Sequence, residues 1–423
     1  MRLIYTCIFY LLLPFILLRL LWRSIAAPAY AKRWAERFGF FSKLETSRQV
    51  IWLHTVSVGE FLAALPLIRR LLADEQVQLV ITTTTPTGSE RVRATLGDTV
   101  FHVYAPYDLP DVLARFLKRV KPNLYLIMET ELWPNTIAAC ARRGIPAVLM
   151  NARLSEKSAR GYARFPGLSA SMLNNLHLAL IQNSIDAARF VDLGLSQSKV
   201  RVTGNIKFDL SINDELRAQA AELKQQLLAS GERVIWIAAS THQGEDELIL
   251  DAFTQVRQRL GGSAKQLMLI LVPRHPERFE RVGQLCSARG FITLRRSQKT
   301  VSADMDILLG DTMGELMLMF GASDIAFVGG SLVPNGGHNF IEPAAWGLPL
   351  LSGQHLFNFA EVSDLLSSAG ALDVAANTDE LVHSLHELLV NPELRKSRGE
   401  SAARVALENR GALDKTLAVI NSL

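Results

Sequence analysis

VIWLHTVSVGEFLAALPLIRRLLA, residues 50–73, contains the pattern that decides the fold: a short apolar run, a polar turn with a glycine, and a longer amphipathic segment. Residues 50–54 form an apolar run that ends at His54, which is typical of a strand buried on both faces. Residues 61–73 carry apolar side chains at helical spacing and predict a helix. A buried strand followed by a helix is the first half of a βαβ unit. The stretch therefore predicts a parallel sheet covered by helices.

The same alternation recurs along the chain and predicts two α/β halves. In the first half, further strands are expected at residues 77–82, 124–128, 147–150 and 178–181, and further helices at 110–120 and 136–143. In the second half, strands are expected at residues 234–238, 267–272, 325–328 and 348–351, and helices at 246–260, 276–288 and 314–320. The halves join near residues 208–213, and the tail from Pro392 is expected to be helical. Two doubly wound domains should place their strand C-termini opposite each other across a cleft, the usual ligand site of such sheets.

Composition supports a globular protein and excludes several classes. With 423 residues the chain is too long for one ordinary core, and 49% hydrophobic with 20% charged residues excludes general disorder. Three cysteines lie far apart (Cys7, Cys140 and Cys286), so neither a disulfide framework nor a zinc site is expected. The sequence has no GxxxxGK[ST] phosphate loop and no GxGxxG that opens a helix after a strand. This argues against a kinase, a P-loop hydrolase and an ordinary dehydrogenase.

The N-terminal segment is apolar and is followed by cations. Residues 3–18 form an apolar or weakly polar run, and Arg19 and Arg23 come directly behind it. This predicts a membrane helix that either spans the bilayer or lies in its interface, with the catalytic body on the cytoplasmic side. A cleaved signal peptide is the alternative, because Ala27-Pro28-Ala29 resembles a small-residue cleavage site.

The charge balance is asymmetric along the chain. Residues 1–121 carry 16 Lys/Arg against 9 Asp/Glu, whereas the chain as a whole has 45 against 41. A basic N-terminal half suits an anionic membrane surface or a phosphorylated acceptor. The sequence shows no motif typical of RNA or DNA binding, so we expect no nucleic acid partner.

Carboxylates follow two predicted strands of the first half. Glu60 lies three residues after Ser57, which fits a capping box at the start of a helix. Its place at a strand C-terminus equally suits a general base that removes a proton from an acceptor hydroxyl. Both interpretations hold only in part, because a carboxylate engaged in capping is a poorer base. Glu129 and Glu131 follow a strongly apolar strand, where they either begin a helix, bind substrate hydroxyls or hold a lysine in place.

Cations also follow strands. Arg153 and Lys207 each come just past a strand, where they either neutralise a phosphate or a developing leaving-group charge or are ordinary surface charges. In the second half, Arg274 and His275 follow the strand at 267–272, and Pro276 suits the first position of a helix. A phosphate would be favoured there.

Two turns of the second half are also candidates for binding a nucleotide. Residues 311–316 lead into a helix whose free N–H groups can hold an anion or a base edge. The glycine-rich loop at residues 336–343 offers backbone amides up to Asn339, and Glu342 follows one turn later to accept hydrogen bonds from ribose. The DxD of the chain, at residues 304–306, enters a strand where a metal-binding DxD should follow one. A metal-bridged diphosphate donor is therefore not favoured.

Taken together, these residues resemble the family of 3-deoxy-D-manno-octulosonic acid (Kdo) transferases of Gram-negative lipopolysaccharide synthesis. The matching stretches are SVGE (57–60), METELWPN (128–135), NARLS (151–155), TGNIKFD (203–209), PRHPERF (273–279), MGEL (313–316) and GGHNFIEPA (336–344). The resemblance implies a GT-B fold with two Rossmann-like domains facing across a cleft and an N-terminal membrane helix. The expected domains are residues 1–40 as the anchor, 41–208 for the acceptor, and 209–423 for the nucleotide sugar with a closing C-terminal helix.

The resemblance also implies a reaction. Kdo would pass from CMP-Kdo to a tetraacyl lipid A precursor (lipid IVA) at the cytoplasmic face of the inner membrane, by inverting, metal-independent transfer. Glu60 would be the general base, and Glu131 and Lys207 would assist the transition state. The residues implied to hold CMP are Arg274, His275, Gly314, Glu315, Leu316, Asn339 and Glu342. CMP-Kdo would be a substrate, so no cofactor is expected. The alternatives are a GT-B transferase or epimerase that uses another nucleotide sugar, and a non-catalytic membrane-bound nucleotide sensor.

Overall fold

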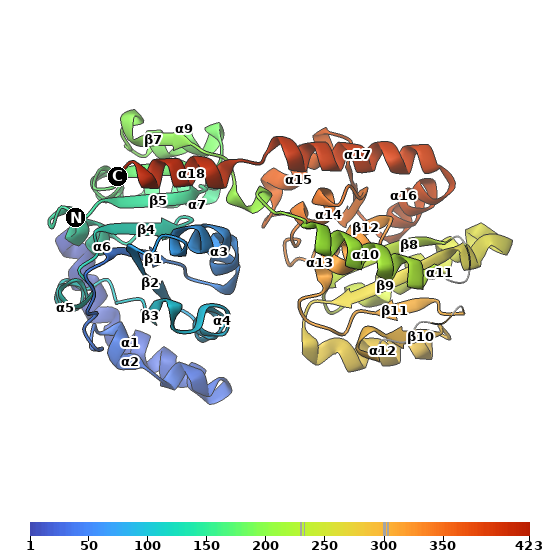
Figure 1. The fold of residues 1–423 in the computed structure, drawn as a ribbon, viewed down its shortest axis with the longest axis horizontal. Coiled ribbons are helices and arrows are strands. Elements are labelled where there is room, and N and C mark those ends of the chain that lie inside the picture. Colours follow the sequence, from blue (N-terminus) through green and yellow to red (C-terminus); the bar gives the residue numbers. More distant parts are fainter. Residues whose placement is uncertain (229–230, 232, 299–301, 303) are drawn as a thin grey trace. The chain divides into compact units, whose positions relative to one another are not determined.

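The computed structural model describes residues 1–228, 231, 233–298, 302 and 304–423. Within these residues the chain forms two compact units: unit 1 comprises Met1–Asp209 and Arg410–Leu423, and unit 2 comprises Leu210–Asn409. Each unit is built on a parallel sheet of seven strands with helices packed on both faces (Figure 1). The two parallel α/β units and the N-terminal apolar helix confirm the predicted fold class.

Unit 1 alternates strands and helices in chain order. Its strands are β1 (Gln49–His54), β2 (Val77–Thr83), β3 (Phe101–Tyr104), β4 (Leu124–Met128), β5 (Ala147–Ala152), β6 (Leu178–Ile181) and β7 (Val200–Val202). Its α-helices are α1 (Arg2–Ala26), α2 (Trp34–Arg37), α3 (Val58–Leu72), α4 (Pro86–Leu96), α5 (Pro110–Val120), α6 (Pro134–Ala141), α7 (Glu156–Ala163), α8 (Pro166–Asn174), α9 (Ser184–Asp192) and α18 (Ala412–Asn421). Its 3-10 turns are η1 (Pro28–Ala31), η2 (Gly97–Thr99), η3 (Gln197–Lys199) and η4 (Ile206–Phe208). Several helices start at a proline, which has no N–H to leave unsatisfied there.

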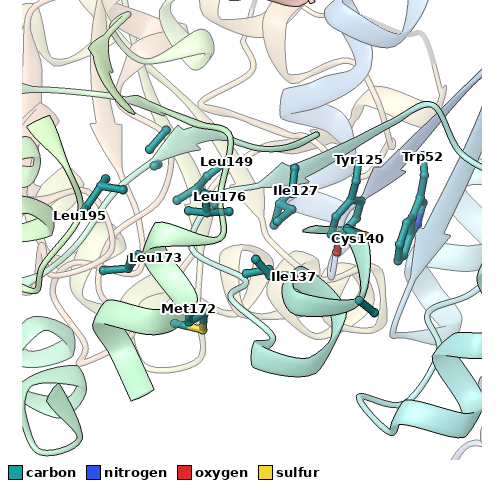
Figure 2. Close-up of a cluster of buried hydrophobic side chains, with 14 of the residues drawn as sticks. Trp52, Tyr125, Ile127, Ile137, Cys140, Leu149, Met172, Leu173, Leu176 and Leu195 are labelled. Atoms are coloured by element: carbon teal, nitrogen blue, oxygen red, sulfur yellow. The ribbon is translucent and has the colours of Figure 1, made fainter. Parts of the chain in front are cut away.

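The sheet of unit 1 has the strand order β3-β2-β1-β4-β5-β6-β7. The order changes direction between β1 and β4, and this switch point is where doubly wound sheets bind ligands. One core under the sheet includes Trp52 of β1 and Tyr125 of β4, whose ring centres lie 3.8 Å apart (Figure 2). Trp52 also donates from Nε1 to Thr82 Oγ1 at 2.9 Å, so this buried ring has no unmet polar group. The core thus fixes the two strands that flank the switch point.

Unit 2 repeats the alternation. Its strands are β8 (Val234–Thr241), β9 (Leu267–Pro273), β10 (Thr293–Arg295), β11 (Ile307–Leu309), β12 (Ile325–Val328), β13 (Leu350–Gly353) and β14 (Leu372–Ala375). Its α-helices are α10 (Asp214–Leu227), α11 (Glu245–Leu260), α12 (Phe279–Ala288), α13 (Leu316–Gly321), α14 (Ile341–Ala345), α15 (Ala360–Ser368), α16 (Thr378–Val390) and α17 (Pro392–Glu408). Its 3-10 turns are η5 (Gly261–Gln266), η6 (Pro276–Arg278) and η7 (Arg296–Gln298). The helix predicted at residues 276–288 therefore begins as a 3-10 turn and becomes α-helical only at Phe279.

The sheet of unit 2 has the strand order β10-β11-β9-β8-β12-β13-β14, so its switch point lies between β8 and β12. The two loops that leave these strands pass very close to each other. A Cβ added to Gly329, just after β12, would lie 2.5 Å from the carbonyl oxygen of Ser240, at the end of β8. Only glycine fits at that distance, so the loop after β12 is tied to the loop after β8 by backbone contact.

Helix α1 is long and apolar enough to cross a membrane, and most of it is exposed. Two polar side chains nevertheless join it to unit 1. Tyr10 donates to Asp111 Oδ1 at 2.5 Å, and Thr6 exchanges hydrogen bonds with the side chain of Asn135 at 2.9 and 3.2 Å. These contacts seat the helix against the starts of α5 and α6.

The last residues of the chain return to unit 1. Helix α18 packs on α3 and η4, and Asp209 accepts hydrogen bonds from Gly411 N and Leu413 N at 2.5 Å each. Residues 410–423 are thus placed in unit 1 by their contacts, whereas the sequence pattern placed them in the second domain. A helical pattern shows that a helix forms, but it does not show which sheet the apolar face covers.

Candidate functional site

Glu60 lies in the first turn of α3, directly after β1. Ser57 caps the helix by accepting from Glu60 N, and the Glu60 carboxylate accepts from Val56 N at 2.7 Å and from Ser57 Oγ at 3.1 Å. The expected capping box is therefore present only in part: Ser57 caps the helix, but Glu60 accepts from the N–H of Val56 rather than from that of Ser57. Each carboxylate oxygen has two acceptor positions, so one hydrogen bond to each oxygen leaves the other position available.

Partial burial has the largest effect on the pKa of the Glu60 carboxyl group. Desolvation raises the pKa of its carboxyl group from 4.5 to about 7, and the nearby charges of Glu129 and Glu131 act in the same direction. The hydrogen bonds from Val56 and Ser57 oppose this by favouring the charged form, but their effect is smaller. A carboxylate with a pKa near 7 is well matched to taking up a proton at neutral pH. Capping and basicity thus coexist, because burial outweighs the capping hydrogen bonds.

Glu129 and Lys207 form an ion pair beside Glu60. Glu129 directly follows β4 and has φ +55°, a conformation uncommon for glutamate. It accepts from Lys207 Nζ at 2.7 Å, and Arg153 Nε lies 3.6 Å from its other carboxylate oxygen. Of the two acids that the sequence left open as the holder of a lysine, the structure selects Glu129. The sequence predicted that Glu129 and Glu131 belong to the site, but it did not predict which of them pairs with the lysine.

Glu131 occupies the loop between β4 and α6 and is half-buried. Desolvation raises its pKa, a hydrogen bond from Trp133 lowers it, and the charge of Glu129 raises it again. Its charge also raises the pKa of Glu60, so the two carboxyl groups interact electrostatically. The structure therefore brings Glu60, Glu131 and Lys207 together at one edge of the unit 1 sheet.

Asn151 is a second positioning residue of this edge. It lies near the end of β5 with φ +50°, and its Oδ1 accepts from Ile206 N at 3.0 Å. Ile206 begins η4, the turn that carries Lys207, so Asn151 fixes the place from which the lysine reaches Glu129. The NARLS stretch thus contributes its asparagine as well as Arg153.

In unit 2, Arg274 and His275 follow β9 and are exposed. Arg274 N donates to Thr241 O at 3.0 Å, which ties this loop to the end of β8. Burial raises the pKa of Glu342 and lowers that of His338, and the charge of Arg274 lowers both, so Arg274 acts on residues of the glycine-rich loop and of α14. Arg274, His275 and Glu342 therefore share one edge of the unit 2 sheet, as predicted.

The sequence reasoning missed His242, Glu245 and a role for the His338 side chain. His242 follows β8, and its Nε2 lies 2.7 Å from Nε2 of His338. The ring centre of His275 lies 5.4 Å from that of His242. A histidine directly after a strand, followed by the acids 245–247, was the signal that could have identified this turn.

The remaining predicted residues lie in turns at the same edge. Gly314 has φ +88°, and Glu315, the residue before α13, accepts from Arg296 Nη2 at 2.9 Å and from Thr312 Oγ1 at 2.5 Å. Leu316 is the first residue of α13. Asn339 Oδ1 accepts from Ile341 N at 3.0 Å, and its side chain also bonds to Glu342, whose pKa is raised by burial. Asn339 thus accepts from the first residue of α14 and orients Glu342.

The DxD stretch lies elsewhere. Asp306 directly precedes β11 and pairs with Arg257 at 2.6 Å, so it lies at the end of the strand opposite to the candidate site. Among the residues that the structure describes, no group of three or more His, Cys, Asp or Glu side chains is arranged to hold a metal ion.

Comparisons with known proteins show what the chain is similar to. The family model described as 3-deoxy-D-manno-octulosonic-acid transferase (kdotransferase) matches residues 32–210. The 3-deoxy-D-manno-octulosonic acid transferase of Haemophilus influenzae is 44% identical, over 98% of this chain and 97% of its own.

Two solved structures are also similar. UDP-GlcNAc 2-epimerase from Neisseria meningitidis covers 89% of this chain and 100% of its own, with a TM-score of 0.59 and 14% identity, which supports the fold alone. The C-terminal CMP-Kdo binding domain of WaaA from Acinetobacter baumannii is 35% identical and covers 46% of this chain and 98% of its own, with a TM-score of 0.42.

Proposed function

We infer that this chain, which belongs to the 3-deoxy-D-manno-octulosonic acid (Kdo) transferase family, transfers Kdo from CMP-Kdo to a tetraacyl lipid A precursor. Membership of the family makes the chain a glycosyltransferase. The donor, the acceptor and the roles of individual residues are the content of the proposal. The observation that carries it is the half-buried carboxylate of Glu60 directly after β1, where desolvation raises its pKa to about 7, as fits a general base.

In the proposed reaction Glu60 takes the proton of an acceptor hydroxyl. The hydroxyl oxygen then forms a bond to the anomeric carbon of Kdo, while the bond from that carbon to the phosphate oxygen breaks on the opposite face. The electron pair of the broken bond leaves with CMP, and the configuration at the anomeric carbon is inverted. No metal is needed in this scheme, because the leaving phosphate can be stabilised by cations and N–H groups.

Lys207 and Glu131 assist the transition state. Lys207 is fixed by its 2.7 Å contact with Glu129, so its cation offers positive charge in a set position. The interaction of Glu131 with Glu60 raises the pKa of Glu60, which increases the affinity of the base for the proton it must accept. Positioning of this kind is effective because the charges need not reorganise during the reaction.

Unit 2 binds the nucleotide. Arg274 and His275 are exposed at the end of β9 and offer charge and hydrogen bonds to a phosphate. Asn339 holds Glu342 in place, and Glu342 accepts hydrogen bonds from ribose hydroxyls. The turn of Gly314, Glu315 and Leu316 provides backbone N–H groups. CMP leaves with one more negative charge on its phosphate than it carried in the donor, which the charge of Arg274 favours.

Helix α1 serves as the membrane anchor, with both α/β units on the cytoplasmic face of the inner membrane. Its hydrogen bonds through Thr6 and Tyr10 to unit 1 support retention, because a cleaved signal peptide needs no such contacts. N-terminal sequencing of the membrane-bound protein tests this. A start at Met1 or Arg2 is expected, and a start near Lys32 would contradict the anchor.

Product analysis tests the function as a whole. The detergent-solubilised full chain is incubated with lipid A precursor and either CMP-Kdo or UDP-GlcNAc. The molecular masses of the lipid products are then measured by mass spectrometry. The lipid should gain the mass of one or more Kdo residues with CMP-Kdo only. Sugar transfer from UDP-GlcNAc alone would overturn the proposal, and protein carrying Glu60→Gln is the control for background transfer.

A further inference from the structure

His242 and His338 form a direct imidazole pair at the switch point of unit 2. His242 follows β8 and His338 belongs to the glycine-rich loop after β12, the two strands between which the order reverses. Their Nε2 atoms are 2.7 Å apart, the ring planes differ by 5°, and the ring centres are 4.9 Å apart. Coplanar rings that meet at their nitrogens share one N–H···N hydrogen bond, because one ring donates and the other accepts.

The buried carboxylate of Glu245 joins the two loops that carry the pair. Glu245 is fully buried and accepts from four backbone N–H groups: His242 N and Gly330 N at its Oε2, and Ser331 N and Leu332 N at its Oε1. It thereby binds the loop of His242 to the loop that leads to His338. Gly330 lies against the rings with φ +72°, and a Cβ there would approach His338 to 3.1 Å. The neighbouring backbone is therefore shaped around the two imidazoles.

The charges around the pair favour an anion. His242 is near His275, Arg274 and Arg278, with Asp246 as the opposing charge, and His338 is near Arg274 and His275. Asp246 is buried and paired with Arg278, and Glu245 is turned to backbone N–H groups. Burial lowers the pKa of His338 to about 4 and also lowers that of His242, with the neighbouring cations adding to the effect. The pair is therefore neutral at pH 7 and lies among cations.

We propose that His242 and His338 together bind the phosphate of the nucleotide and take up one proton when the bond to the sugar breaks and the phosphate becomes a dianion. The inference rests on the proposed function and deepens it by adding two residues and a proton to the donor site. In the neutral pair, one Nε2–H is shared between the rings and one Nδ1 carries no hydrogen. A phosphate dianion raises the pKa of the imidazoles, and a proton from solvent then adds to that Nδ1. The pair gains one positive charge as the leaving phosphate gains one negative charge.

Calorimetric titration of CMP into the detergent-solubilised full chain measures this proton directly. Titrations between pH 6 and pH 8, each in two buffers of different ionisation enthalpy, give the number of protons bound with CMP. The wild type should take up more protons than His242→Gln or His338→Gln, with a difference approaching one near pH 6. Both variants should bind CMP about tenfold more weakly at pH 6, in line with the loss of a hydrogen bond to a charged group. Their affinity should vary less with pH than that of the wild type.

The matched control is His383→Gln, which removes an exposed histidine of α16 and should leave affinity and proton uptake unchanged. Equal proton uptake in the wild type and both pair variants would overturn the proposal. If a variant fails to fold, the histidine NMR signals of the wild-type protein provide the test. Protonation of an imidazole when CMP is added, but not when cytidine is added, would support the proposal. Unchanged histidine signals on adding CMP would refute the proposal. Proton-linked CMP binding without Kdo transfer would refute the proposed function and leave the pair intact.

Discussion

Glu60 in unit 1 and Glu245 in unit 2 hold corresponding places, each in the first turn of the helix that follows the first strand of its sheet. Glu245 is fully buried and accepts from four backbone N–H groups, so its capacity is used to join two loops. Glu60 accepts from two donors only and has acidic neighbours, and its pKa is raised to about 7. Corresponding turns of the two units thus hold a structural carboxylate in unit 2 and, in the proposed function, the general base in unit 1.

The two sheet edges differ in the same sense. Unit 1 presents Glu60, Glu129 and Glu131 around Lys207, whereas the strand ends of unit 2 present Arg274 and three imidazoles. The acids of unit 2 that lie close to its imidazoles, Glu245 and Asp246, are buried and engaged with backbone N–H groups or Arg278. A fold of this kind fixes where a site lies, and the local hydrogen-bond partners decide which chemistry it performs.

Replacement of the reactive carboxylate gives the largest expected effect. Glu60→Gln keeps an acceptor for Val56 N but cannot take up a proton, so kcat should fall by about 10²- to 10⁴-fold. Steady-state kinetics with CMP-Kdo measure kcat, and calorimetry measures CMP affinity, which should be unchanged. Glu75→Gln, at an exposed site of unit 1, is the control. A near wild-type kcat in Glu60→Gln would remove the distinction between the two carboxylates.

Removal of a cation from unit 2 should act on binding instead. Arg274→Gln loses a charged partner for phosphate, which corresponds to about 1.5–3 kcal/mol, or about 10- to 150-fold in donor KM. The rate at saturating donor should change far less. Arg281→Gln removes an exposed arginine of the same unit, paired with Glu247 at 3.8 Å, and should leave KM unchanged. A decrease in kcat without a change in donor KM in Arg274→Gln would contradict the assignment of donor binding to unit 2.

A smaller effect is expected from the residue that holds Lys207. Glu129→Gln replaces the carboxylate by a neutral amide, so Lys207 loses the charge that positions it. A loss of about 1.5 kcal/mol in transition-state stabilisation would lower kcat about tenfold. Stopped-time assays at saturating donor measure it, and Glu156→Gln, which breaks the exposed pair with Arg160, is the control. Unchanged kcat would show that Lys207 needs no partner.

The smallest effect is expected for the contacts that hold helix α18 on unit 1. Asp209→Asn keeps one acceptor oxygen for Gly411 N and Leu413 N instead of two, so α18 should lose about 1 kcal/mol of local stability. Hydrogen exchange of the α18 amides should become about fivefold faster at that loss. Asp414→Asn, on the same helix with a 3.4 Å contact to exposed Arg70, should change exchange less. Equal exchange in both variants would show that Asp209 does not hold α18.

Strands with continuous apolar runs could be predicted because burial on both faces leaves no polar residue in them. Leu124–Met128 and Ile325–Val328 were predicted with their observed bounds. The short strands β3, β7, β10 and β14 were missed: they are three or four residues long, and exposed or half-buried positions within them break the apolar pattern. The destination of α18 was missed because its contacts depend on the folded surface of unit 1 rather than on its own pattern.

The candidate site was predicted to a similar degree. Residues such as Glu60, Lys207 and Arg274 follow strands, so the topology alone brought each to the carboxyl edge of its sheet. The partner of Lys207 could not be predicted, because Glu129 reaches it through a backbone conformation with φ +55° that no spacing reveals. The contact of His242 with His338 joins residues 96 positions apart and depends on the close approach of two loops at Gly329.

The most direct test of a reactive Glu60 is the pH dependence of a single round of Kdo transfer with saturating CMP-Kdo. The base must be deprotonated before the reaction, and its pKa is raised from 4.5 to about 7. The rate should therefore rise about tenfold per pH unit below pH 7 and level off above it. The same shift makes the folded state hold its proton more tightly than the unfolded state, so stability should fall as pH rises from 4.5 to 7. Glu60→Gln should abolish both trends. A rate that already levels off near pH 4.5, or a pH profile that Glu60→Gln leaves unchanged, would contradict the assignment of Glu60 as the base.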